Sequence, residues 1–324
     1  MAAAVDSSVV VPASIPRPPD RYRTFTAVIS WAAPASLILI VVVLLQQAWP
    51  SVVRFGPGFI IGQDWNQVTN TFGALPFIFG TVVTSAIALV IALPVGIAVA
   101  VLLAEPGAQG LRGALGTGIE LLAAIPSVVY GIWALYVLAP WALLHIETPI
   151  TDHLAAIPFL GGIPRQTSLF TAALVLAVMI LPTLSAVSRD VIRAVPRGLR
   201  ESTVALGATW WETIWKVILP AARAGIFGAT VLALGRALAE TVAVAMVIGN
   251  RFALPHSVST TLLSPGATLG SAVINTFGEA APGLQRSAVI AVVVYLLAIS
   301  VTVNAVGQLL LRRRRRQAAR LVIL

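Results

Sequence analysis

The chain has 324 residues, of which 58% are hydrophobic and only 10% are charged, and its mean hydropathy is +0.94. Soluble domains carry about 45–50% apolar and about 25% charged residues, so this composition excludes a soluble globular protein and indicates a membrane protein. The chain has no cysteine, which excludes disulfides and thiol chemistry, and its three histidines (His145, His153 and His256) lack metal-ligand spacing.

Six charge-poor segments follow one another along the chain, each long enough for a bilayer-spanning helix of about 20 residues. They cover residues 24–53, 65–104, 121–144, 166–188, 224–250 and 287–311, and only the fifth contains charged side chains. The sequence therefore predicts an all-α polytopic membrane protein with six transmembrane helices over residues 25–311. We expect a proline-rich, disordered tail at 1–24 and a basic tail at 312–324.

The distribution of basic residues predicts the orientation. Most of the 21 Lys and Arg residues lie in the two tails, at Arg112 and in the loop 188–223, which six spans place on one side of the membrane. The positive-inside rule assigns that side to the cytoplasm. We therefore expect a multi-pass membrane protein with both termini cytoplasmic. Its basic tail favours membrane lipid as a partner over nucleic acid.

Nucleotide chemistry is not expected in this chain. The only lysine is Lys216, flanked by Trp215 and Val217, so the Gly-Lys-Ser/Thr of a phosphate-binding P-loop is missing. We expect the chain to be no enzyme and to need no cofactor, and any ATP that drives transport must be hydrolysed by another polypeptide.

The most specific motif lies in the loop 188–223. Glu201-Ser202-Thr203 is followed after three residues by Gly207 and after nine more by Val217-Ile218-Leu219-Pro220. This pattern resembles the coupling-loop signature of ABC importer permeases, E-A-A-x3-G-x9-I-x-L-P, with small or similar residues at the three differing positions.

The apolar residues of this loop repeat at helical spacing. Five of them fall on one helical face, namely Val204, Ala208, Trp211, Trp215 and Ile218. Gly207 allows a break between two short helices, and Pro220 suits the entrance to the next span. An amphipathic helix here can dock in a groove of a partner or lie on the bilayer with its tryptophans at headgroup level. The signature spacing favours docking.

Arg236 and Glu240 stand inside the fifth predicted span. Their i, i+4 spacing places them on one helical face, where they can pair. A charge at mid-bilayer costs at least about 2.5–3.5 kcal/mol, so such residues face a pathway or one another. An arginine fork suits an oxyanion, and an ion pair that only fixes helix packing is the alternative.

Smaller signals come from hydroxylated and small residues in the spans. Thr81, Ser127 and Tyr130 can line a pathway, although such residues in membrane helices also serve as packing contacts. Pro94 and Pro182 are expected to kink their helices, with the freed carbonyls satisfied by neighbours.

From about residue 25 to 311 the chain resembles the PstC family, permeases of the bacterial phosphate ABC importers. The resemblance rests on the coupling loop and on blocks at residues 72–81, 120–131, 179–190, 205–209 and 236–241. Ala239 stands where the family has glycine.

The resemblance implies a type I ABC importer permease fold, a place in the bacterial plasma (inner) membrane and a phosphate pathway shared with a second, PstA-like permease. It also implies a PstB-like ATPase dimer and an external, PstS-like phosphate-binding protein as partners. The residues that we assign to the pathway are Arg236, Glu240, Thr241, Ser127, Tyr130 and Thr81. Those that we assign to ATPase coupling are Glu201, Ser202, Thr203, Ala205, Gly207, Ala208 and Trp211.

Two other functions stay open on the residues alone. An ABC permease for another oxyanion, such as sulfate or molybdate, would share the coupling loop. An ion-driven secondary transporter could use Arg236 and Glu240 as a relay, although the coupling loop would then serve no purpose.

Overall fold

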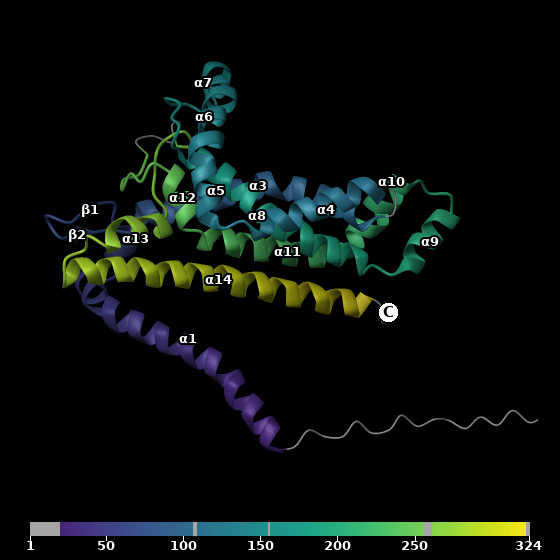
Figure 1. The fold of residues 1–324 in the computed structure, drawn as a ribbon, viewed down its shortest axis with the longest axis horizontal. Coiled ribbons are helices and arrows are strands. Elements are labelled where there is room, and N and C mark those ends of the chain that lie inside the picture. Colours follow the sequence, from purple (N-terminus) through teal and green to yellow (C-terminus); the bar gives the residue numbers. More distant parts are fainter. Residues whose placement is uncertain (1–19, 106–108, 155, 256–260, 322–324) are drawn as a thin grey trace, which may run out of the picture. The chain divides into compact units, whose positions relative to one another are not determined.

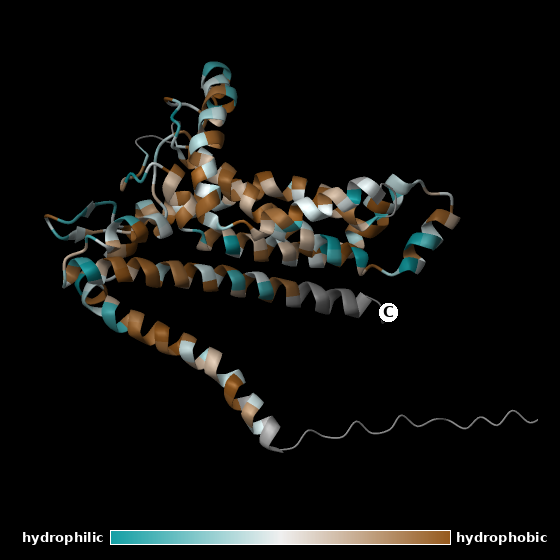
Figure 2. Cartoon of the chain, in the orientation of Figure 1, coloured by the Kyte–Doolittle hydropathy of each residue, from teal (hydrophilic) through white to brown (hydrophobic). Residues whose placement is uncertain are grey.

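The structure, a computed structural model, describes residues 20–105, 109–154, 156–255 and 261–321. Six helical stretches in the described residues are long and apolar enough to cross a membrane, as the sequence predicted. They run over Thr24–Phe55, Leu75–Ala104, Ser127–Leu154, Leu169–Arg193, Trp210–Ala239 and Leu284–Leu311. The ribbon in Figure 2, coloured by residue hydropathy, shows that hydrophobic residues predominate along these stretches.

The chain divides into two compact units, residues 1–46 and 47–324. Helix α1 (Asp20–Phe55) contributes to both. Because α1 begins at Asp20, residues 20–24 of the expected disordered tail are helical, whereas residues 1–19 lie outside the described residues. At the other end of the chain, α14 (Leu284–Leu321) continues helically through most of the predicted basic tail.

The second unit is built around two long helices, α3 (Leu75–Ala104) and α8 (Leu169–Arg193), which pack along each other (Figure 1). Helix α11 (Leu219–Ala239) packs against both of them and against α14. Small residues allow this close approach: a Cβ atom on Gly96 of α3 would lie 2.8 Å from Leu184 Cδ2 of α8. Contacts of this kind are typical of membrane helices, whose association depends on packing.

Between α3 and α8 the chain forms α4 (Gln109–Ala124) and then the third span. Pro126 separates the two, since a residue before proline avoids the helical region. The third span is a continuous series of α5 (Ser127–Trp133), η1 (Ala134–Leu138), α6 (Ala139–Ala142), η2 (Leu143–Glu147) and α7 (Thr148–Leu154). It therefore lies further along the chain than the predicted 121–144.

Three π-helical segments occur in the described residues, η1, η2 and η3 (Thr213–Ile218), and each ends two residues before a proline. These prolines are Pro140, Pro149 and Pro220. Proline has no N–H and its ring clashes with the carbonyl four residues earlier. The wider winding of a π-helix accommodates this conflict inside a continuous helix. Pro94 and Pro182 instead lie within α3 and α8, which continue on both sides of them.

Short elements complete the unit. They are α2 (Gly58–Ile61), an antiparallel pair of two-residue strands, β1 (Trp65–Asn66) and β2 (Thr71–Phe72), and the helices α9 (Arg197–Ala205), α10 (Trp210–Glu212), α12 (Val242–Val247) and α13 (Leu269–Phe277). The strands occupy the flank of the predicted 65–104 segment, and the Trp65 and Phe72 rings meet edge-to-face at 4.9 Å.

Candidate functional site

The charged pair of the fifth span lies at a break between two helices. Helix α11 ends at Ala239, Glu240 is extended (φ −70°, ψ 134°), and α12 starts at Val242. The prediction that Arg236 and Glu240 share one face of a continuous helix is therefore wrong. Among the described residues no ion pair joins them.

Arg236 is held by a neighbouring helix. It lies in the last turn of α11, where a cation is stabilised by the partial negative charge of the helix C-terminus. Its Nη1 donates to Thr183 Oγ1 of α8 at 2.8 Å, while the side chain stays exposed within this chain. One hydrogen bond leaves the other guanidinium donors available to a ligand. The sequence did not single out Thr183, because no motif or spacing distinguishes it from the other Ser and Thr residues of the spans.

Glu240 is engaged on the other side of the break. Its Oε1 accepts from the backbone N–H of Ala243 at 3.3 Å, so the carboxylate caps the start of α12. Thr241 follows at a tight junction with α13, since a Cβ on Gly270 would lie 2.4 Å from Thr241 Cγ2. Each member of the pair is thus stabilised by its own helix end, which explains how they coexist without contact.

Two other predicted pathway residues have their polar groups committed inside the chain. The Tyr130 hydroxyl donates to the carbonyl of Leu122 at 2.8 Å across the Pro126 bend. Thr81 is 2% exposed, and its Oγ1 accepts from Leu269 N at 2.9 Å at the start of α13. These contacts favour a positioning role for both.

The remaining predicted pathway residue, Ser127, is the half-buried first residue of α5. The buried part of the third span does approach the break, since Tyr130 belongs to the same buried cluster as Ala237 and Ala243. A Cβ on Gly131 would lie 2.5 Å from Met246 Sδ of α12.

The predicted coupling segment breaks at Gly207, as expected, but only the helix before the break is short. After the break α10 continues through η3 and α11 as one helical stretch, Trp210–Ala239, so the fifth span starts earlier than the predicted 224–250. Gly207 adopts a left-handed conformation (φ +84°) and follows Leu206, the C-cap residue of α9. Its N–H donates to Val204 O at 2.9 Å, and the N–H of Ala208 reaches back to Thr203 O at 3.3 Å. This pair of bonds is the Schellman motif, which closes a helix and reverses the chain, and it favours glycine at the left-handed position.

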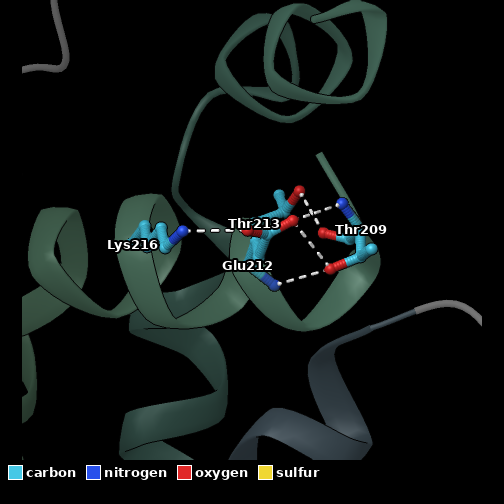
Figure 3. A network of polar contacts seen from close by, with 4 residues as sticks. All are labelled: Thr209, Glu212, Thr213 and Lys216. Carbon is cyan, nitrogen blue, oxygen red and sulfur yellow. Dashed lines mark hydrogen bonds and ion pairs between the residues drawn. The ribbon is translucent and has the colours of Figure 1, made fainter. Parts of the chain in front are cut away.

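Helix α10, which follows the turn, starts with a reciprocal cap (Figure 3). The Thr209 side chain accepts from Glu212 N at 3.3 Å, and Glu212 Oε2 accepts from Thr209 N at 3.0 Å. Lys216 Nζ then pairs with Glu212 Oε1 at 2.8 Å, one turn further along the helix. These contacts fix the direction in which the chain leaves Gly207, because they satisfy the first N–H groups of α10.

The single amphipathic face predicted for this loop is wrong. The left-handed turn at Gly207 separates Val204 from the later positions, and Val204 is 59% exposed whereas Ile218 is 1% exposed. Trp211 and Trp215 are exposed and line an apolar hollow of about 760 Å³ together with Leu93 and other α3 residues. Of the two alternatives for this loop, this placement favours indoles that lie at the headgroup level of the bilayer over indoles that dock in a groove of a partner.

The other coupling candidates lie on and just after α9. Glu201, Ser202 and Ala205 are exposed and Thr203 is half-buried, and Val204 of the same helix is also exposed, so α9 presents both polar and apolar side chains. The hydroxyl of Thr203 donates to Leu199 O at 2.6 Å within the helix.

A buried acidic residue was missed by sequence reasoning. Glu147 is 0% exposed, and Ser168 Oγ and Thr171 Oγ1 donate to its Oε1 at 2.8 and 2.9 Å. The N–H of Arg165 reaches its other oxygen at 3.2 Å. The carboxylate therefore ties the end of the third span to the start of α8. In the described residues no group of three acidic or histidine side chains could hold a metal ion.

Comparison with known proteins defines the class. The family model of the binding-protein-dependent transport system inner membrane component matches residues 92–316. The fold is similar to a chain of a bacterial alginate ABC transporter, with a TM-score of 0.59 and 16% identity over 91% of this chain and 96% of that one. The MetNI methionine ABC transporter gives a TM-score of 0.51 at 19% identity, covering 72% and 93%. The chain is thus a membrane component of a binding-protein-dependent transport system.

Curated relatives narrow this class. The phosphate transport system permease protein PstC of Pasteurella multocida is 42% identical over 281 residues, 86% of each chain. The PstC protein of Mesorhizobium japonicum is 40% identical over 304 residues, covering 90% of this chain and 92% of the relative. A probable PstC of Methanocaldococcus jannaschii is 31% identical over 302 residues, covering 91% and 94%. The chain belongs to the PstC family of permeases.

Proposed function

We propose that this chain is one of two permease subunits of an ATP-driven importer of inorganic phosphate. The observation that carries the proposal is the similarity to phosphate transport permeases over most of both chains. The charged break in the fifth span supports it, because an oxyanion needs a fixed cationic donor and Arg236 is held in place by Thr183.

In the proposed pathway, phosphate meets Arg236 at the end of α11. The guanidinium uses one donor for Thr183 and offers the others to phosphate oxygens. Glu240 caps α12 in this structure. When the break changes shape during the cycle, its carboxylate competes with phosphate for Arg236 and promotes release.

The energy comes from outside the chain. A PstB-like ATPase dimer docks on α9 and the Gly207 turn. The motion of α9 and this turn opens and closes the pathway between the spans of this chain and those of a second, PstA-like permease. An external, PstS-like protein delivers phosphate. Both termini face the cytoplasm, in keeping with the basic residues in the two tails and in the loop 188–223.

Proteoliposomes that contain the chain with these partners test the proposal. We expect ATP-dependent uptake of labelled phosphate that is insensitive to sulfate and molybdate and that Arg236→Ala abolishes. Arg189→Ala is the matched control, since Arg189 is bonded to neighbouring Asp190 at 3.1 Å, outside the break. Normal uptake in Arg236→Ala would refute the site, and uptake driven by an ion gradient without ATP would refute the transporter class.

A further inference from the structure

A hollow of about 540 Å³ lies where α3, α4, α8 and α9 come together at the arginine-rich end of the second unit. Such a volume is typical of ligand sites. We call it the arginine hollow, and its lining residues are Ala104, Arg112, Arg193, Arg197, Arg200 and Glu201. Four guanidinium groups thus surround one space, although like charges repel when they are brought together.

One of the four arginines is neutralised within the chain. Arg200 pairs through Nη1 with Glu105, which is 6% exposed, and its Nη2 donates to Ile192 O at 2.8 Å. Burial lowers the pKa of the Arg200 guanidinium, but arginine stays protonated at physiological pH. This pair is structural, because removal of either partner would leave a buried charge alone.

Two more arginines are fixed at the end of α3. Arg193 Nη2 donates to Leu103 O at 2.7 Å, and Arg112 Nη2 donates to the carbonyl of Glu105. These bonds satisfy carbonyls that the helix end leaves free. They hold both guanidinium groups in place but leave their charges without a carboxylate partner among the described residues.

Donors remain that no described residue uses. Arg112 Nε is buried without a hydrogen-bond partner. Arg197 is exposed, and no hydrogen bond or ion pair joins its side chain to the described part of the chain. The lining contains four arginines and one acidic residue, Glu201, and the charge of Arg200 is matched by Glu105. The hollow therefore has excess positive charge and several fixed N–H groups.

We propose that the arginine hollow binds a phosphate group, a function beyond the transport pathway. Phosphate carries negative charge and several acceptor oxygens, which match clustered guanidinium forks better than a single carboxylate does. The group comes from the headgroup of an anionic phospholipid or from free inorganic phosphate. The hollow adjoins the end of a membrane span at Ala104, where headgroups are within reach, and basic pockets between helices bind anionic headgroups.

Arg197→Gln is the variant that tests the proposal, because it removes a charge from the lining without breaking a described contact. Arg197→Lys is a second variant that keeps the charge but loses the fork. Arg189→Gln is the matched control, since it removes an arginine that lies near the same end of α8 but does not line the hollow. Thermal melting curves like that of the parent protein show that all three variants are folded.

Two probes distinguish the sources. Retention of phosphatidylglycerol over phosphatidylcholine by the full-length chain is measured by native mass spectrometry. Binding of inorganic phosphate is measured by calorimetry in detergent, in an Arg236→Ala background that removes the proposed pathway site.

We expect Arg197→Gln to weaken binding of one probe by about fivefold, because one basic residue near a membrane surface contributes about that factor to affinity. Arg197→Lys should weaken binding less. A loss confined to phosphatidylglycerol identifies a lipid site, and a loss confined to inorganic phosphate identifies an ion site. Binding of neither probe to the parent protein, or equal losses in Arg197→Gln and Arg189→Gln, would overturn the proposal.

Discussion

Gly207 offers the sharpest test of the coupling segment. The residue has φ +84°, and a Cβ atom built on it would meet nothing within 4 Å. Gly207→Ala therefore introduces no clash, and its only cost is the left-handed backbone that the Schellman motif requires. The variant isolates the geometry of the turn from the packing of a side chain.

The size of the effect follows from that conformation. An L-residue other than glycine pays about 1–2 kcal/mol in the left-handed region. A difference of that size shifts the equilibrium between the capped turn and other conformers by a factor of about 5–30. Gly207→Asn should lose less than Gly207→Ala, because asparagine tolerates this region better.

Gly198 provides the matched control. It lies within α9, its Cβ would also meet nothing within 4 Å, and its φ is not in the left-handed range. Alanine at this position should stabilise the helix by about 1 kcal/mol. The two Gly→Ala changes thus add the same methyl group to neighbouring open sites, with opposite backbone consequences.

The assay is ATP hydrolysis by the reconstituted transporter, stimulated by phosphate-loaded binding protein, together with phosphate uptake. We expect Gly207→Ala to lower stimulated hydrolysis and uptake together by at least about fivefold, whereas Gly198→Ala retains both. Equal activity of Gly207→Ala and Gly198→Ala would show that the left-handed turn has no part in coupling.

Three further substitutions test other contacts. Thr183→Val removes the hydrogen bond that holds Arg236, and uptake should fall about tenfold while the melting temperature stays within a few degrees; unchanged uptake would remove Thr183 from the site. Glu147→Ala leaves three donors unpaired inside the protein, and thermal melting should show a loss of about 3 kcal/mol; a melting curve like that of the parent would contradict this role. Gly80→Ala should prevent correct folding, because its Cβ would lie 2.1 Å from Ala267 O; a well-folded variant on size-exclusion chromatography would show that the backbone before α13 can shift.

Much of the architecture was predictable from the sequence because local composition determines it. Six apolar segments predicted six spans, since any stretch of about 20 apolar residues must leave water. The helix break at Gly207 was also predictable, because glycine favours the left-handed turn and the nearby signature indicated where a turn was needed.

The shape of the charged site was not predictable in the same way. An i, i+4 spacing places two residues on the same face only if the helix is continuous between them. Helix α11 ends at Ala239, so Glu240 lies outside it. Around the break, Gly131 of α5 lets α12 approach closely, and Gly270 of α13 lies against Glu240 and Thr241. Contacts between segments far apart in sequence carry no periodic signal, so local patterns could not reveal them.

The sequence by itself determined that this chain has six membrane-spanning segments, where the turn of the predicted coupling segment lies and which family the chain resembles. The reason is that hydropathy, glycine conformation and motif spacing are properties of consecutive residues. Only the tertiary structure decided that Thr183 holds Arg236, that Glu240 caps a separate helix and that four arginines surround one hollow. Those arrangements depend on which helices pack together, and packing is decided by the whole set of helices at once.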